Sequence, residues 1–172
     1  MTRLSTARLV LRRATWSDLD AVHDMLSRPE AMRYWSRPAH ETVQETRDWL
    51  ERLIDRDTGG SDDFLITRQG KVIGKAGMWR LGEVGFMIHP DHWRQGLARE
   101  AMQAVIPHIF AQHPVDHLTA EADPRNAASI GLLTRLGFAE THRAANTLLW
   151  GVEWCDSVYF QLNRADWNPT SE

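Results

Sequence analysis

Residues 89–101, with the sequence HPDHWRQGLAREA, combine amino-acid types that are suited to binding an anion. Gly96 and Ala98 lie between a turn that contains proline and a segment with helical character. The first backbone N–H groups of a helix have no partner within the helix and carry the positive end of its dipole. Gly96 has no Cβ to obstruct a ligand, and Arg94 and Arg99 add positive charge. The pattern is typical of a pyrophosphate-binding loop, although an ordinary turn before an amphipathic helix has the same composition.

The elements that must position this loop follow from apolar periodicity and from turn residues. Alternating and β-branched residues predict seven strands, at residues 8–14, 63–69, 71–79, 83–89, 115–122, 138–145 and 153–164. Apolar residues at helical spacing predict four helices, at residues 15–30, 41–60, 96–113 and 126–138.

Particular residues indicate where these helices begin, bend and end. Ser17 has the side chain of a helix N-cap, and Pro29 is expected to close the first helix. Gly59 and Gly60 are expected to end the second helix. Pro107 lies inside the third helix, and we expect it to kink the helix or shorten its last turns.

The order of the elements predicts an α/β fold in a single domain that spans residues 1–172. We expect a mixed, mostly antiparallel sheet of about seven strands, with helices on both faces. The helix between the fourth and fifth strands requires these two strands to be parallel neighbours. Residues 89–101 begin at the carboxyl end of the fourth strand, where the two strands part and a ligand can enter.

Composition argues against several classes of partner and location. The chain has 20 basic and 23 acidic residues, a net charge of -3 and no block of Lys and Arg, so a nucleic-acid partner is not expected. Its single cysteine, Cys155, allows no internal disulfide. No run of about 18 apolar residues and no signal-peptide core is present, so we expect no membrane association and a cytoplasmic location. The oligomeric state stays open between a monomer and a homodimer.

A second motif, NAASIGLLTRLGF at residues 126–138, follows the fifth predicted strand. Together with WRQGLA at residues 93–98, it resembles the GNAT superfamily of acyl-CoA-dependent N-acetyltransferases, and within it the RimJ/RimL-like branch. The segments TARLVLRRATWSDLDAVHDML, PEAMRYW and WCDSVYFQL are also similar to that branch, so that the resemblance spans almost the whole chain.

The resemblance implies acetyl-CoA as the acyl donor. It places the pyrophosphate at the loop and implies a β-bulge in the fourth strand near Met87 to His89, whose backbone would pair with the pantetheine arm. Asn126 and Ser129 would lie near that arm and the thioester. The cofactor-binding residues implied in this way are Met87, Ile88, His89, Arg94, Gln95, Gly96, Leu97, Ala98, Arg99, Asn126 and Ser129.

Acyl transfer to an amine requires a neutral amine, a polarised thioester carbonyl and a proton for the leaving thiolate. Glu83 and Glu121 resemble glutamates that act as the base in different members of the superfamily, and either is equally consistent with a solvated carboxylate at a strand end. The tyrosine acid of RimI-like enzymes is replaced by Leu133, and Leu148 occupies the position of a second carboxylate proposed for RimL. Ser129 is the substitute proton donor, or else a plain helix-capping residue.

The chain contains eight tryptophans and eight histidines, and the two groups carry different expectations. Most tryptophans should pack in the core, whereas the resemblance places Trp35, Trp79, Trp150 and Trp154 at the acceptor pocket and makes MRYWSRP a lid. The histidines lack the spacing of metal ligands, so no metal is expected, and only His89 is a candidate to line the cofactor groove.

These features predict an N-acetyltransferase that moves an acetyl group from acetyl-CoA to a primary amine by direct attack in a ternary complex. The acceptor is either a protein N-terminus or a small amine. The alternative is a non-catalytic acyl-CoA-binding sensor or partner module, which the missing tyrosine acid permits. A nicotinamide-dependent Rossmann enzyme is excluded because the glycine loop follows the fourth strand rather than the first and lacks G-x-G-x-x-G.

Overall fold

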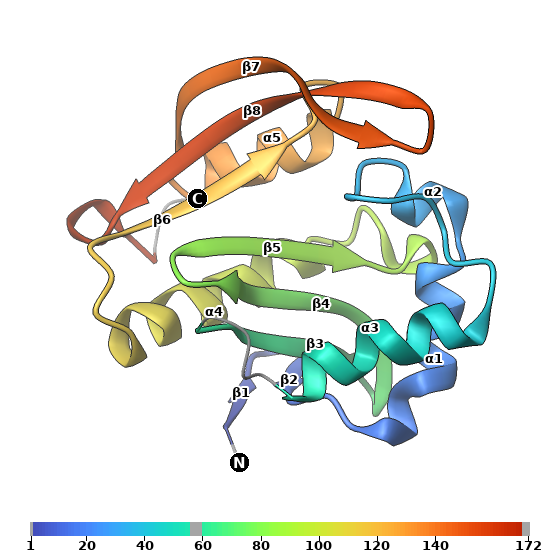
Figure 1. Cartoon of the computed structure of the whole chain (residues 1–172). Coiled ribbons are helices and arrows are strands. Elements are labelled where there is room, and N and C mark those ends of the chain that lie inside the picture. The colour runs from blue at the N-terminus through green and yellow to red at the C-terminus, as the bar shows by residue number, and fades with distance from the viewer. Residues whose placement is uncertain (1, 56–59, 170–172) are drawn as a thin grey trace.

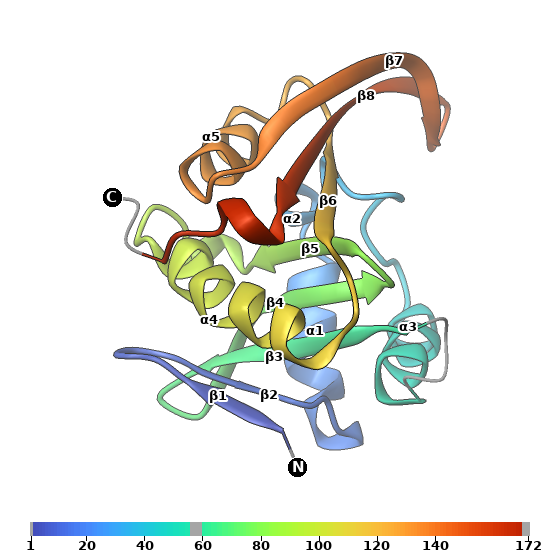
Figure 2. The same cartoon turned by 90° about the vertical axis from the view of Figure 1, so that its left-hand side faces the viewer.

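The computed structural model describes residues 2–55 and 60–169. Within these residues one sheet of eight strands has the order β1-β2-β3-β4-β5-β6-β8-β7 (Figures 1 and 2). The strands are β1 (Arg3–Ser5), β2 (Val10–Arg12), β3 (Asp62–Arg68), β4 (Lys71–Arg80), β5 (Glu83–Ile88), β6 (His117–Ala122), β7 (Ala139–Trp150) and β8 (Glu153–Asn163). The α-helices are α1 (Leu19–Leu26), α2 (Pro29–Met32), α3 (Val43–Asp55), α4 (Leu97–Gln112) and α5 (Ala127–Arg135).

The predicted mixed, mostly antiparallel sheet is confirmed, with one strand more than expected. The extra strand, β1, pairs antiparallel with β2 through Leu4 and Leu11. It has only three residues, RLS, which is too short for an alternating pattern to be recognised. Strand β7 extends to Trp150, five residues beyond the predicted segment, because the edge of the sheet leaves most of its side chains exposed and weakens the apolar pattern.

Helices cover both faces of the sheet, as expected. Helices α1 and α3 lie on one face and α4 on the other (Figures 1 and 2). Leu65 and Met87 belong to the apolar cluster beneath α1 and α3, whereas Phe64 and Ile66 pack in the larger cluster with α4 and α5. Since alternate residues of a strand point to opposite faces, these assignments show to which face of the sheet the other side chains of a strand point.

The predicted parallel pair is β5 and β6, and it is open at one end. The two strands are in register only at Glu83 and Thr119, where the Thr119 N–H donates to the Gly82 carbonyl over 2.7 Å. Beyond this point β6 turns away with β8 and β7, as Figure 1 shows. The carboxyl end of β5 therefore faces a gap in the hydrogen-bonding ladder, which is the arrangement that the sequence predicts.

The segment expected to form one helix at residues 15–30 is divided into three helical pieces. Thr15, rather than Ser17, begins the segment, because its N–H and hydroxyl donate to the Asp18 carboxylate over 2.9 and 3.0 Å. A 3-10 turn at Trp16–Asp18 then leads into α1. Pro29 starts α2 instead of closing a helix, since proline's fixed φ and missing N–H suit a first helical position.

The two longer helices differ from expectation only in detail. Helix α4 continues through Pro107 to Gln112, so the expected shortening is wrong. The buried residues around the proline, Val105, Ile106 and Ile109, hold the helix against the sheet where one backbone hydrogen bond is missing. Gly59, one of the two glycines expected to end α3, lies outside the described residues. None of the helices in the described part of the chain has both the length and the apolar character that a membrane-spanning helix needs.

Candidate active site

The loop that follows β5 reaches the N-terminus of α4 through two residues with left-handed backbone. Arg94 has φ 59°, and Gly96, the N-cap of α4, has φ 73°. Left-handed backbone is unfavourable for most residues but free of cost for glycine. Leu97 and Ala98 open the first turn of α4 directly after this left-handed N-cap. The turn and the helix start that the sequence predicts are therefore present here.

Two arginines from other elements brace this loop. Arg8, which precedes β2, donates to the Gln95 carbonyl over 3.0 Å and forms an ion pair of 2.6 Å with Glu100 on α4. Arg68, at the end of β3, donates to the side-chain oxygen of Gln95 over 2.7 Å. Gln95 is thus part of the loop's support. The sequence pattern identified the loop but contained no signal for these distant partners.

The carboxyl end of β5 is more regular than expected. Strands β4 and β5 stay in register from Gly74 and Ile88 to Met78 and Val84, and the irregularity in their pairing lies between Met78 and Arg80. The expected bulge near residues 87–89 is therefore wrong for this pairing. The hydrogen bond from the His89 N–H to the Ile73 carbonyl, 2.8 Å long, extends the regular ladder past the strand end.

The side chains at this strand end have partners that the sequence pattern did not predict. The Trp93 indole N–H donates to the Ile88 carbonyl over 2.7 Å. The His89 ring is buried and lies 3.2 Å from the Asp24 carboxylate on α1. Since the side chains of Met87 and His89 point to the α1 side, neither side chain lines the side of α4. The His89 ring was a candidate to line the cofactor groove, and the structure directs it elsewhere.

Asn126 and Ser129 form a single hydrogen-bonded unit at the start of α5. Asn126 is the N-cap, and its side-chain oxygen accepts the Ser129 N–H over 3.2 Å. The Asn126 amide also donates to the Ser129 hydroxyl over 2.9 Å. Ser129 is therefore not the cap of this helix. Its hydroxyl oxygen is held by Asn126, which leaves the hydroxyl hydrogen to be donated to another group.

The two candidate bases lie on the same face of the sheet, at different points of the opening between β5 and β6. Glu83 is paired with Thr119, and Glu121 lies two residues further along β6, toward the end where the strands part. Both point to the face of α1 and α3. Arg80 holds Glu83 through two contacts of 2.8 and 2.5 Å, whereas Glu121 accepts a hydrogen bond from Ser157.

The four tryptophans assigned to the acceptor pocket do not form one group. Trp150 lies on the face of Glu121, and its indole donates to the Met32 carbonyl of α2 over 3.2 Å. Trp35 is half-buried, with the Lys75 ammonium 5.8 Å from its ring centre. Trp79 is exposed, and the Arg80 guanidinium lies over one face of its ring. Trp154 is 59% exposed and lies on the opposite face of the β7–β8 hairpin.

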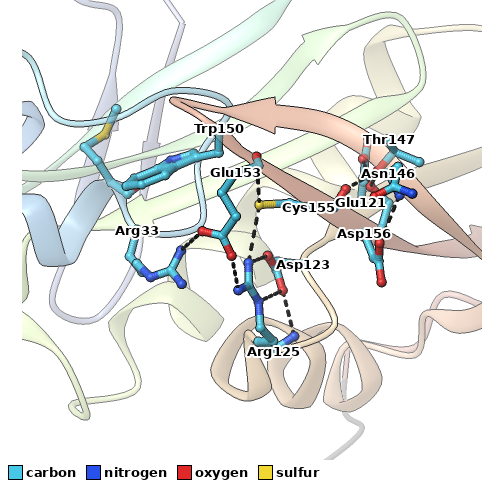
Figure 3. Close-up of polar contacts among 12 residues, drawn as sticks. Arg33, Glu121, Asp123, Arg125, Asn146, Thr147, Trp150, Glu153, Cys155 and Asp156 are labelled. Atoms are coloured by element: carbon cyan, nitrogen blue, oxygen red, sulfur yellow. Dashed lines mark hydrogen bonds and ion pairs between the residues drawn. The ribbon is translucent and has the colours of Figure 1, made fainter.

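An ion-pair network that sequence reasoning missed joins the start of α5 to this hairpin (Figure 3). Arg125 contacts Asp123 at 2.6 and 2.9 Å, Glu153 at 2.7 Å and the sulfur of the buried Cys155 at 3.3 Å. The hydrogen bond from Arg125 is the main reason that the pKa of Asp123 lies below its ordinary value. Burial acts in the opposite direction and raises this pKa. Arg33 lies 3.8 Å from Glu153 and extends the network to the end of α2.

Within the described residues, no group of three or more His, Cys, Asp or Glu side chains is arranged to hold a metal ion. The half-buried rings of His108 and His113 have a protein partner, since their ring nitrogens lie 2.9 and 2.8 Å from Asp62.

Comparison with known proteins identifies the family. A sequence model described as an acetyltransferase (GNAT) domain matches residues 8–139. An uncharacterized N-acetyltransferase, p20 of Bacillus licheniformis, is 29% identical over 147 residues, which are 80% of this chain and 83% of the relative. The [ribosomal protein uS5]-alanine N-acetyltransferase of Escherichia coli is 33% identical over 86 residues, half of this chain and 44% of the relative.

Solved structures show the same fold. RimL, the ribosomal L7/L12 alpha-N-protein acetyltransferase in complex with coenzyme A, has a TM-score of 0.82 at 16% identity, covering 94% of this chain and 98% of its own. Spermidine N-acetyltransferase from Vibrio cholerae, in complex with CoA and spermine, has a TM-score of 0.81 at 18% identity with the same coverage. Fold, loop and sequence match agree, and the chain belongs to the GNAT family of acyl-CoA-dependent N-acetyltransferases.

Proposed function

We propose that this enzyme transfers the acetyl group of acetyl-CoA to a protein N-terminus by direct attack within a ternary complex. The observation that carries the proposal is the position of Glu121, which lies at the opening between β5 and β6 and faces away from α4 and α5. The donor would approach from the side of α4 and α5, and the acceptor amine from the side of α1 and α3. The two substrates would then meet where the strands part.

The chain's own groups fit the diphosphate of coenzyme A at the start of α4. Gly96 is exposed, and a Cβ built on it would have only the Arg8 side chain nearby, at 3.7 Å, so the approach is open. The first-turn N–H groups would bind the phosphate oxygens, and the exposed Arg94 side chain would add positive charge. Ile88 would offer its backbone N–H to the pantetheine arm, whereas the Met87 backbone pairs with β4 and does not reach it. Ala98 and Arg99 complete the helix end. Asn126 and Ser129 would lie beside the thioester.

Glu121 is the preferred base in this proposal. A base must accept a proton from the attacking amine, and a guanidinium already seated on a carboxylate competes with that amine for the same oxygens. Glu83 is in that condition, because Arg80 contacts it twice. Glu121 accepts a hydrogen bond from the Ser157 hydroxyl, and it remains exposed to an incoming amine.

The charge on the acceptor side favours a substrate with a single amino group over a polyamine. Four carboxylates on or beside this face are paired with a cation: Glu83 with Arg80, Asp63 with Lys75, and both Asp123 and Glu153 with Arg125. A polyamine needs several unpaired carboxylates to replace its hydration, whereas an N-terminus needs one base and a surface for the adjoining residues. Trp150 and Trp35 would supply apolar surface of that kind.

The proposal is tested by turnover with a panel of acceptors. Acetyl-CoA is incubated with a peptide that begins with alanine, with spermidine and with free lysine, and coenzyme A release is followed as free thiol while mass spectrometry identifies the product. We expect acetylation of the peptide at its α-amino group. Preference for spermidine would replace the N-terminus by a polyamine as the acceptor. Binding of acetyl-CoA without turnover of any amine would favour the non-catalytic module.

Ser129 supplies a prediction about the leaving thiolate. If its hydroxyl hydrogen is donated to the departing sulfur, Ser129→Ala should lower kcat by about 10- to 1,000-fold, because an acid catalyst is lost and water replaces it only in part. The KM for acetyl-CoA should change little. Asn126 keeps its capping bond to the backbone N–H in this variant, so the helix start is preserved. A normal kcat would reduce Ser129 to a structural role.

A further inference from the structure

The β7–β8 hairpin is irregular beside Glu121. Ala144 pairs with Ser157, and Leu148 with Cys155, so that four residues of β7 span the distance of two residues of β8. Asn146 lies in the middle of this bulge with φ 54°, a left-handed conformation that asparagine tolerates better than most residues. Its N–H donates to the Asp156 carboxylate over 2.9 Å (Figure 3). The bulge is therefore held by specific contacts.

The bulge brings Thr147 back toward β8. The Thr147 hydroxyl lies 2.5 Å from the hydroxyl of Ser157, which is only 3% exposed. Ser157 in turn donates its single hydroxyl hydrogen to one oxygen of Glu121. Since that hydrogen is used, the contact between the two hydroxyls can be donated only by Thr147, whose single hydrogen has a second acceptor in the Cys155 carbonyl at 3.2 Å. The shorter contact favours Ser157, so the chain runs from Thr147 to Ser157 to the Glu121 carboxylate.

We propose that Ser157, oriented by Thr147, is a positioning residue that holds the Glu121 carboxylate in the orientation needed to accept the amine proton. This inference rests on the proposed role of Glu121 as the base. An exposed glutamate on a strand samples several rotamers, and a hydrogen bond from a buried donor selects among them. With one oxygen bound to Ser157, the other is available to the acceptor. Misplacement of a catalytic group by about 1 Å can reduce a rate about 100-fold.

The first test removes each hydroxyl in turn. Ser157→Ala should lower kcat about 10-fold or more, with an unchanged KM for acetyl-CoA, because the base is misoriented while donor binding is intact. Thr147→Val should lower kcat by a smaller factor, and Thr147→Ser, which keeps the hydroxyl, should retain the wild-type value. Thr147 is exposed, so its variants are expected to fold even if Ser157→Ala is unstable. The unfolding midpoint of each variant serves as the control.

The second test combines Ser157→Ala with Glu121→Gln. If Ser157 acts through Glu121, the double variant should have the same kcat as Glu121→Gln alone, whereas independent effects would multiply. A Glu121→Gln variant with normal kcat would contradict the proposed base. If Glu121→Gln lowers kcat while Ser157→Ala and Thr147→Val leave kcat normal, the positioning role of Ser157 is overturned and the role of Glu121 as the base is kept. The positioning role is also overturned if Thr147→Ser lowers kcat as much as Thr147→Val does.

Discussion

Glu121→Gln is expected to lower kcat/KM near pH 7 by about 100-fold or more, the contribution of a general base, and to recover partly at higher pH. The recovery follows from the acceptor. An α-amino group has an ordinary pKa of about 7.7 to 8.0, so its neutral fraction rises from about one tenth near pH 7 to nearly all of it above pH 9. Because the neutral fraction rises only about tenfold, the recovery is limited to about tenfold, and a base is still needed for the proton that the amine releases on attack. The measurement is the pH profile of kcat/KM with the alanine peptide.

Glu83→Gln is the matched control for this result. It removes a carboxylate on the same face of the sheet, but one that Arg80 already pairs, so its effect on the profile should be smaller. Larger loss in Glu83→Gln than in Glu121→Gln would transfer the role of the base to Glu83. Wild-type profiles for both variants would show that neither carboxylate is the base.

Gly96→Val is expected to weaken acetyl-CoA binding by about 10-fold or more while the fold is retained. The physical reason has two parts. A branched Cβ would stand where the diphosphate should meet the helix N–H groups, and valine is strained at the φ of 73° that the loop requires. About 1.4 kcal/mol of lost diphosphate contact corresponds to a tenfold change in affinity. The strain, about 1–2 kcal/mol for an ordinary residue, adds to this by shifting the loop out of the shape that presents its N–H groups. Titration calorimetry with acetyl-CoA measures the change.

Gly82→Val distinguishes loss of the loop from general backbone strain. Gly82 has φ 83°, and a Cβ added there meets nothing within 4 Å, so its substitution carries a similar backbone penalty. It lies before Glu83, at the end of β5 opposite to the α4 loop. We expect Gly82→Val to lose stability but to bind acetyl-CoA as the wild type does. Equal affinities for Gly96→Val and the wild type would rule out this helix end as the diphosphate site.

The architecture and the loop were accessible from the sequence because both depend on local patterns. Apolar periodicity and turn residues predicted the order of strands and helices, and a helix between two strands requires those strands to be parallel. Gly96 indicated where α4 begins, and the motif that starts at Asn126 indicated where α5 begins. In each case the residues that define the feature lie within a few positions of one another.

The environment of the site was decided only by the tertiary structure, because it depends on pairs that are remote in the chain. Glu121 meets Ser157 across 36 positions, since β8 is placed beside β6 and the bulge at Asn146 brings in a second hydroxyl. Arg8 supports the loop across 87 positions. The expected role of the His89 ring failed for the same reason, as strand alternation directs the ring to Asp24, 65 positions away. Residue types and local spacing identify the groups that are able to do chemistry. Sheet order and register determine which of these groups meet, because strand pairing, and not proximity in sequence, sets the side-chain contacts across strands.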